Sequence, residues 1–137
     1  MINITIDGNP ESWKSPQRCG NHYFSPNHKR KEEIKWQVKE QWTGNPIISP
    51  IKIKASFDLP IPSSTSKKKT FEMLNQAYHN KKPDLDNLLK LAIDSIKGIV
   101  IEDDNQVCQI EATKQYSKEP KTNLYIYDLS NTYEDLI

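Results

Sequence analysis

Two pairs of aspartates stand on either side of one apolar segment, and side chains of this type at this spacing could bind a metal ion or take part in catalysis. Asp84 and Asp86 precede the segment, and Asp103 and Asp104 follow it. Carboxylates that lie close together repel one another unless a cation is bound between them. Hard oxygen ligands without His or Cys nearby select Mg²⁺, with Mn²⁺ as a substitute, over zinc. If the two pairs meet, they therefore indicate a metal site of the kind used in phosphoryl transfer.

Each pair also has a purely structural explanation. Asp84 and Asp86 stand where a helix is expected to begin, and carboxylates are favourable there as N-caps and at the positive end of the helix dipole. Asp103 and Asp104 belong to "EDDN", whose residues are common in turns. A helix over 84–97 is roughly 20 Å long, so only a returning strand could bring Asp104 back to Asp84. The spacing permits a shared site without requiring one.

Lys90 lies four residues after Asp86 and four before Asp94, so the three residues share one helix face. One explanation is a surface ladder of ion pairs, worth ~0.3–0.5 kcal/mol each. The other places the Lys90 ammonium beside the cation, where it would stabilise negative charge on a scissile phosphate. Spacing alone favours neither.

The elements that must position these residues follow from apolar periodicity. Alternation predicts strands at "INITID", "IKIKASFDL", "QVCQIEATKQY" and "NLYIYDL". Two main helices are expected, one over about 26–42 with Ser25 as N-cap and Pro26 as first residue, and one from about Asp84 to Gly98. The buried stripe of the second helix is expected to be Leu85, Leu88, Leu89, Ala92 and Ile96. The order β-α-β-α-β-β predicts an α+β fold with a mixed or mostly antiparallel sheet.

We expect a single domain over residues 1–137, completed by loops and a tail. The stretch "GNPESWKSPQRCGNHYFSPN" is rich in turn-forming residues and predicts a long loop. Segment 61–82 predicts a mobile basic loop that could hold a short helix around "FEMLNQAY". Residues 99–101 are expected to be a short extended piece, and 130–137 a loose tail.

Composition and charge narrow the class of protein. No stretch is apolar enough to span a membrane, and no secretory signal is recognisable. Cys19 and Cys108 lack any CxxC spacing, so free thiols and a cytoplasmic location are expected. Residues 1–83 hold 14 Lys and Arg against 7 Asp and Glu, while the remainder holds 5 against 11. A basic part beside an acidic part suits an enzyme that acts on a polyanion through acid-bound metal.

Basic residues are densest just before the second helix. They are Lys67, Lys68, Lys69, Lys81 and Lys82. Such a run is usually solvated surface, but its position beside the acids makes it a candidate contact for DNA phosphates. Arg18 is a further DNA-binding candidate, followed by the run at 29–31. Trp13, Trp36 and Trp42 are expected to be core or dimer contacts rather than platforms for bases.

The segment "PDLDNLLKLAIDSIKGIVIEDDNQV" resembles the signature of the RusA family of Holliday-junction resolvases, D-x-D-N-L-x-K followed by D and then D-D-x-Q-V. The lead-in "SSTSKKK" is similar to that of prophage-type members, and "SPQR" to the family's N-terminal basic loop. By this resemblance Asp84, Asp86 and Asp104 fall on the metal-binding acids and Lys90 on the catalytic lysine, with Asp103 in reserve for Asp104.

The resemblance implies a RusA-like fold and a crossover junction endodeoxyribonuclease. Such an enzyme is a homodimer that uses Mg²⁺ to place paired symmetric nicks in four-way junction DNA, in recombination and repair, with no membrane and no small-molecule cofactor. Two alternatives stay open. A nuclease with broader specificity for branched DNA would use the same residues. A non-catalytic DNA-binding protein would use the aspartates only as helix caps and turn residues.

Overall fold

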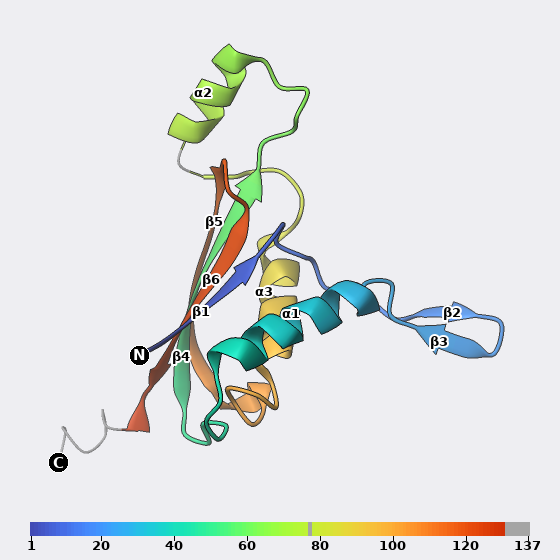
Figure 1. Ribbon diagram of the computed structural model, residues 1–137, viewed down its shortest axis with the longest axis vertical. Coiled ribbons are helices and arrows are strands. Elements are labelled where there is room, and N and C mark those ends of the chain that lie inside the picture. The colour runs from blue at the N-terminus through green and yellow to red at the C-terminus, as the bar shows by residue number, and fades with distance from the viewer. Residues whose placement is uncertain (77, 131–137) are drawn as a thin grey trace.

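The protein is built on a four-stranded mixed sheet, seen here in a computed structural model that describes residues 1–76 and 78–130 (Figure 1). The strands are β1 (Ile2–Asp7), β4 (Ile51–Pro60), β5 (Val107–Ser117) and β6 (Lys121–Asp128). Their order in the sheet is β1-β6-β4-β5. β6 is antiparallel to both of its neighbours, while β4 and β5 are parallel. The predicted α+β fold with a mixed sheet is therefore confirmed.

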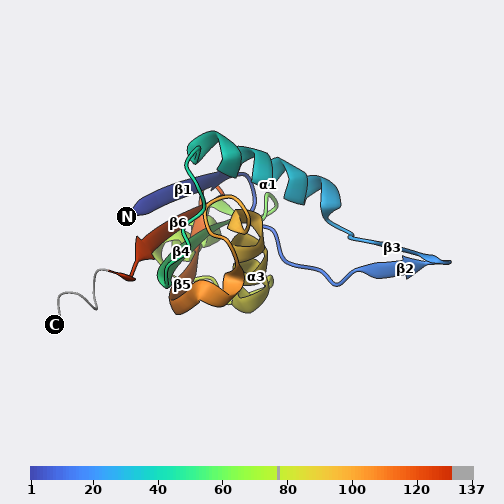
Figure 2. The same cartoon turned by 90° about the horizontal axis from the view of Figure 1, so that it is seen from below.

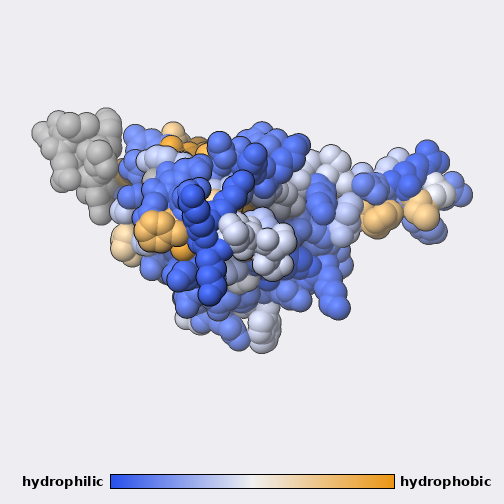
Figure 3. Space-filling model, turned by 90° about the horizontal axis from the view of Figure 1, so that it is seen from above, coloured by the Kyte–Doolittle hydropathy of each residue, from blue (hydrophilic) through white to orange (hydrophobic). Residues whose placement is uncertain are grey.

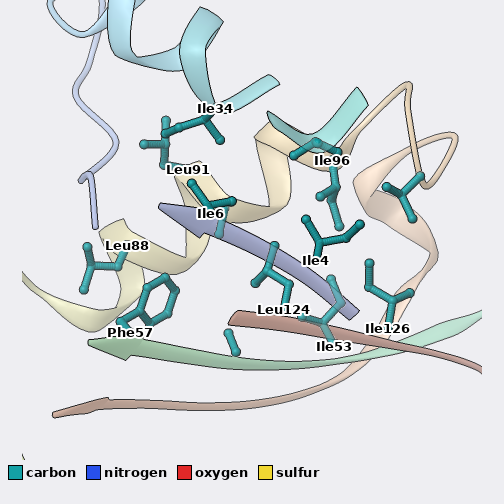
Figure 4. Packing of buried hydrophobic residues seen from close by; sticks show 14 of the residues in the cluster. Ile4, Ile6, Ile34, Ile53, Phe57, Leu88, Leu91, Ile96, Leu124 and Ile126 are labelled. Carbon is teal, nitrogen blue, oxygen red and sulfur yellow. The ribbon is translucent and has the colours of Figure 1, made fainter. Parts of the chain in front are cut away.

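Two helices, α1 (His28–Gln41) and α3 (Leu85–Ile96), cover the same face of this sheet (Figures 1 and 2). α1 packs against β1, and α3 packs against β5 and against α1. The core lies between these layers (Figure 4), where Phe57 of β4 lies beside Leu88 of α3, and Ile53 and Leu91 belong to the same buried cluster. Each such side chain contributes about 1.5–3 kcal/mol by leaving water. The core thus holds α3 firmly against the sheet.

The helix α1 begins two residues later than its sequence predicts. Its N-cap is Asn27 rather than Ser25, and no side chain caps it by a hydrogen bond. Asn27 is buried because its Nδ2 donates to the carbonyl oxygen of Ser12 at 2.7 Å. This tertiary contact across fifteen residues, which no local pattern reveals, decides where the helix starts.

The helix α3 begins one residue after its predicted start at Asp84 and ends two residues before its predicted end at Gly98. Gly98 follows it with φ +79°, as expected of a residue that ends a helix in the left-handed region. Leu91 belongs to the buried stripe, whereas Leu85 and Leu89 are only partly buried. The predicted extended piece at 99–101 is instead a tight turn, in which the amides of residues 99–101 all donate to the carbonyl of Ile96.

The predicted long N-terminal loop contains a β-hairpin, made of β2 (Gln17–Cys19) and β3 (His22–Phe24). It projects away from the sheet and helices (Figures 1 and 2). Gly20, with φ +63°, opens its two-residue turn, a conformation that glycine adopts without strain. Strands of three residues are too short for periodicity to reveal, and so the sequence predicted only a loop.

Segment 61–82 contains the helix α2 (Lys67–Asn75), which starts four residues earlier than the short helix expected there. The Ser66 hydroxyl caps it by accepting from the amide of Lys69 at 3.2 Å. Mobility of this segment stays a prediction. Of the expected tail, residues 131–137 lie outside the described residues. Within residues 1–76 and 78–130, no helix has the length and apolarity needed to cross a membrane.

Candidate active site

The first acidic pair lies at the start of α3. Asp84 occupies the N-cap position, yet its side chain makes no capping hydrogen bond. Asp86 is in the first turn, where its Oδ1 accepts only from the neighbouring amide of Asn87 at 2.9 Å. Both side chains are exposed, and neither forms an ion pair within the described part of the chain. Asp84 is therefore the N-cap residue of α3, as the structural explanation expected, but without the hydrogen bond of a cap, and both carboxylates are exposed to another ligand.

The chain that leads into α3 is fastened to β5. Lys114 Nζ donates to the carbonyl oxygens of Lys81 and Pro83 at 2.6 and 2.8 Å. The amide of His79 donates to the Lys114 carbonyl at 3.0 Å, and the buried His79 ring lies 4.6 Å from that of Tyr116. Burial, followed by the charge of Lys114, lowers the pKa of His79. These contacts fix the approach to the acids at the start of α3.

The second acidic pair begins a short 3-10 helix, η1 (Asp104–Gln106). Asp103 Oδ1 accepts from the amide of Asp104 at 2.8 Å and lies 3.2 Å from Lys97 Nζ. Hydrogen bonds with the Asp104 carboxyl group and with Lys97 lower the pKa of Asp103. Asp103 thus has a structural role as the cap of this turn, whereas the Asp104 side chain is exposed.

Gln106 holds this acidic turn in place with four hydrogen bonds. Its Oε1 accepts from the amides of Glu102 and Asp103, both at 2.9 Å. Its Nε2 donates to the carbonyl oxygens of Ile47 and Ser49, both at 2.8 Å. Residue type and spacing predict no role for Gln106. Its only signal was its place in the D-D-x-Q-V pattern, because a neutral side chain that binds backbone groups carries no chemistry of its own.

An open hollow of about 340 Å³ runs beside α3. It is lined by Asp86, Leu89, Lys90, Ile93, Asp104, Val107 and Ile110. Asp86 belongs to the first turn of α3, whereas Lys97, which binds Asp103, stands at its last turn, about 16 Å away along the axis. One acid of each pair therefore borders the hollow, Asp86 from the first turn of α3 and Asp104 from the side of its last turn. Of the expected residues, the structure brings together Asp86 and Lys90, and Asp104 lies across the hollow from them.

The residues of one chain supply only part of a metal site. Among residues 1–76 and 78–130, no three Asp, Glu, His or Cys side chains lie close enough to hold one ion. β5 runs back along α3 (Figure 1) and starts only at Val107, so Asp104 comes before the returning strand. Carboxylates such as those of Asp84 and Asp86 are the kind of ligand that Mg²⁺ takes, an ion that usually keeps several waters and needs few carboxylates.

Lys90 stacks on an aromatic ring instead of joining an ion-pair ladder. Its Nζ lies 3.6 Å from the ring centroid of Trp13, and no pair with Asp86 or Asp94 forms in the described chain. The amide of Trp13 in turn donates to the carbonyl oxygen of Asn87 at 3.0 Å. Trp13 packs against the core, as expected, and also positions the ammonium group beside the hollow through a cation–π contact.

The candidate DNA-binding residues fall into two places. Lys67, Lys68 and Lys69 form the first turn of α2, which lies beyond the end of β5 (Figure 1). Lys81 and Lys82 follow in the chain that leads to α3, and all five side chains are exposed. Arg18 is separate, on the hairpin, with its Nε donating to the Gly20 carbonyl at 2.7 Å. These groups remain predictions as DNA contacts.

The chain matches the family model described as Endodeoxyribonuclease RusA over residues 7–127, a range that includes both acidic pairs, Lys90 and Gln106. It is also similar to the uncharacterized protein YqaN of Bacillus subtilis (strain 168), with 31% identity over 87 residues. That similarity spans 61% of this chain and 61% of YqaN. Since the family match extends over most of the chain, the protein belongs to the RusA family of endodeoxyribonucleases.

Proposed function

We propose that the protein is a Mg²⁺-dependent, structure-selective endodeoxyribonuclease that resolves Holliday junctions by paired, symmetric nicks in opposed strands. The observation that carries the proposal is that the match to the RusA family coincides with one acid of each pair, Asp86 and Asp104, and with Lys90 around one hollow. The free, exposed Cys19 and Cys108 agree with the cytoplasmic location that this function requires.

The proposed roles follow from the position of each side chain. Asp84 and Asp86 bind the cation from one side, and Asp104 is the third acid, since Asp103 is engaged as a cap. The cation, when bound, supplies Lewis-acid activation of water and phosphate. Lys90, held over Trp13, stabilises the negative charge that develops on the phosphate.

A homodimer would bring together acidic residues that a single chain keeps at opposite ends of α3. Suppose that two copies pack about a two-fold axis that crosses the middle of α3. The Asp104 of each copy then lies beside the Asp86 of the other copy. Apolar side chains already border the hollow, among them Ile110, which is 49% exposed. Contact with a second copy would cover this apolar surface. Each of the two sites would then cut one of the two opposed strands.

Basic residues of α2 and of the segment that leads into α3 are proposed to hold the DNA arms. Lys67–Lys69 and Lys81–Lys82 would neutralise phosphates, which makes affinity fall with salt at a log–log slope of about −0.9 per phosphate contacted. Replacing all five with Ala should reduce both the affinity and this slope. Binding that keeps its strength and its slope after the replacement would exclude this group as the DNA contact.

The test is cleavage of labelled four-way junctions against a matched linear duplex, with Mg²⁺ and with a chelator. Paired nicks at symmetric positions on the junction alone, abolished by the chelator, are expected. Equal cleavage of flaps and forks would favour the broader branched-DNA nuclease. Junction binding without cleavage under Mg²⁺ or Mn²⁺ would favour a non-catalytic DNA-binding protein.

A further inference from the structure

The β2–β3 hairpin is a projecting arm that contributes little to the fold. It forms a two-stranded sheet of its own, separate from the main sheet, and every residue of both strands is exposed. Apolar surface lies among polar side chains on this arm (Figure 3). Tyr23 and Phe24 are 72% and 47% exposed. A short hairpin is only marginally stable by itself. Solvent-exposed aromatic rings on such a hairpin indicate a surface that a partner covers.

The register of the hairpin distributes the rings over both of its faces. Arg18 pairs with Tyr23 across the strands, and Phe24 and His22 occupy the flanking positions of the same strand. Because successive side chains of a strand point to opposite faces, Arg18 and Tyr23 share one face while His22 and Phe24 share the other. Both faces of the arm therefore present a flat ring beside a nitrogen-bearing side chain.

The charge around the arm identifies the chemistry of its partner. The arm and its legs, residues 12–27, include Lys14 and Arg18 and no Asp or Glu, and Lys29 and Lys31 follow at the start of α1, where Arg30 is paired with Glu33. A positive segment with flat rings fits a polyanion whose bases are open to stacking, because every base offers a π face and every linkage a phosphate. The open branch point of a four-way junction offers exposed base pairs of this kind, whereas uninterrupted duplex does not.

The base of the arm is anchored at the proposed active site. Asn27 Nδ2 donates to the carbonyl oxygen of Ser12 at 2.7 Å and so ties the two legs of the arm together. Trp13, on the first leg, donates its amide to Asn87 in the first turn of α3 and carries Lys90 against its ring. The position of the arm is thereby coupled to the turn that holds Asp86.

We propose that the hairpin is a stacking wedge that enters the branch point of the junction, with Tyr23 against one exposed base pair and Phe24 against another. This inference rests on the proposed function and adds to it the element that recognises the branch. Inserted rings unstack neighbouring bases and open the DNA around them. Since the arm is anchored beside Asp86, the position of the inserted hairpin determines which phosphate of the junction reaches the aspartates of the proposed active site.

The test uses the full-length chain carrying Asp86→Asn, which we expect not to cleave, and junctions with 2-aminopurine either at the branch point or within one arm. Binding should raise the fluorescence at the branch point but not within the arm. Tyr23→Ala with Phe24→Ala should abolish the rise and weaken junction binding by about 5- to 150-fold for each stacked base. Trp at both positions should restore the rise, and Leu should not. Thermal unfolding should be unchanged in all of these variants.

The outcomes separate the wedge from the function on which it rests. If the Ala variant keeps the fluorescence rise and the affinity, the wedge is wrong while junction binding stands. If the Ala variant instead loses self-association in sedimentation, the hairpin contacts a second copy and the wedge is overturned. If the parent chain binds junction no better than duplex, the proposed function fails and this inference fails with it.

Discussion

At the scale of single residues, Asp86 offers the sharpest test, because its carboxylate borders the hollow and makes no ion pair in the described chain. Asp86→Asn keeps the size of the side chain and removes the charge that binds a cation. We expect junction cleavage to fall by about 10²–10³-fold or more. Binding should be unchanged or tighter, since one negative charge beside the phosphates is lost. Single-turnover cleavage and a binding titration measure the two effects separately.

The matched control for this change is Asp94→Asn. Asp94 lies on the same helix but does not line the hollow, so this variant should cleave at the parent rate. Equal losses in both variants would mean that the charge of the helix matters rather than a ligand at Asp86. Full activity of Asp86→Asn would remove Asp86 from the site.

Residue types revealed the charged members of the site and concealed the neutral ones. Asp84, Asp86 and Lys90 could be singled out as candidates because clustered charges need a chemical reason, and their roles stay a prediction. Gln106 and Asn27 could not, since their roles consist of hydrogen bonds to backbone groups of segments 57 and 15 residues away. Such partners become known only when the fold brings the segments together.

At the scale of elements, Gln106 decides where the acidic turn lies. Gln106→Leu would leave two amides and two carbonyls without their partner, at a cost of about 1–3 kcal/mol for each buried group left unpaired. Because these four bonds are exposed or only part-buried, water replaces much of what is lost, and we expect the free energy of unfolding to fall by about 2–3 kcal/mol in total. The cleavage rate should fall at saturating junction while the Kd for the junction stays the same, because Asp104 moves but the basic groups do not. Urea unfolding and single-turnover rates provide the two measurements.

Gln109→Leu serves as the control, because Gln109 is an exposed residue of the adjoining strand β5. It should retain both stability and rate. If Gln106→Leu also retained both, the turn would be fixed by other contacts, such as the ion pair between Lys97 and Asp103.

The segment that leads into α3 should respond to pH through His79. Burial and the nearby charge of Lys114 lower its pKa below the usual value of about 6.5. The unfolded chain therefore takes up the proton first, so the stabilisation is complete above about pH 6.5 and is lost as the pH falls through the lower folded pKa. Between pH 7.5 and 5, the parent should lose more stability than His79→Phe, which keeps a ring beside Tyr116.

Denaturant unfolding at several pH values gives this comparison, and an NMR titration of the His79 ring locates its pKa directly. Parallel stability profiles for the parent and His79→Phe would contradict the prediction. A folded pKa at or above that of a free histidine would contradict it as well.

Elements of sufficient length could be predicted, and short ones could not. The four strands of the main sheet and the two main helices each carry enough apolar positions for a period to emerge. The hairpin has three residues per strand, and all of them are exposed. Since no face of it is buried, its sequence shows no alternation of apolar and polar residues. The start of α1 was displaced by the contact between Asn27 and Ser12.

At the scale of the whole molecule, the acids of one chain are divided between the two ends of α3. Sequence suggested a shared site and also that a helix of this length would separate its members. The structure keeps the separation, since Lys97 holds Asp103 at the last turn. A two-fold partner would turn this division into two complete sites, each with Asp84 and Asp86 from one copy and Asp104 from the other.

Mixing two inactive chains tests this arrangement. In a heterodimer of an Asp86→Asn chain and an Asp104→Asn chain, shared sites would place both substitutions in one site and leave the other intact. We therefore expect single nicks in one strand of the junction, from about half of the molecules if the chains pair at random. If each chain builds its own site, every site carries one substitution and no cleavage returns. The control is a mixture of an Asp84→Asn chain and an Asp86→Asn chain. Asp84 and Asp86 of one chain serve the same site, so each site of this heterodimer carries one substitution. The control mixture must therefore stay inactive whether or not the sites are shared. Recovery in the first mixture alone would establish that the functional unit is the dimer.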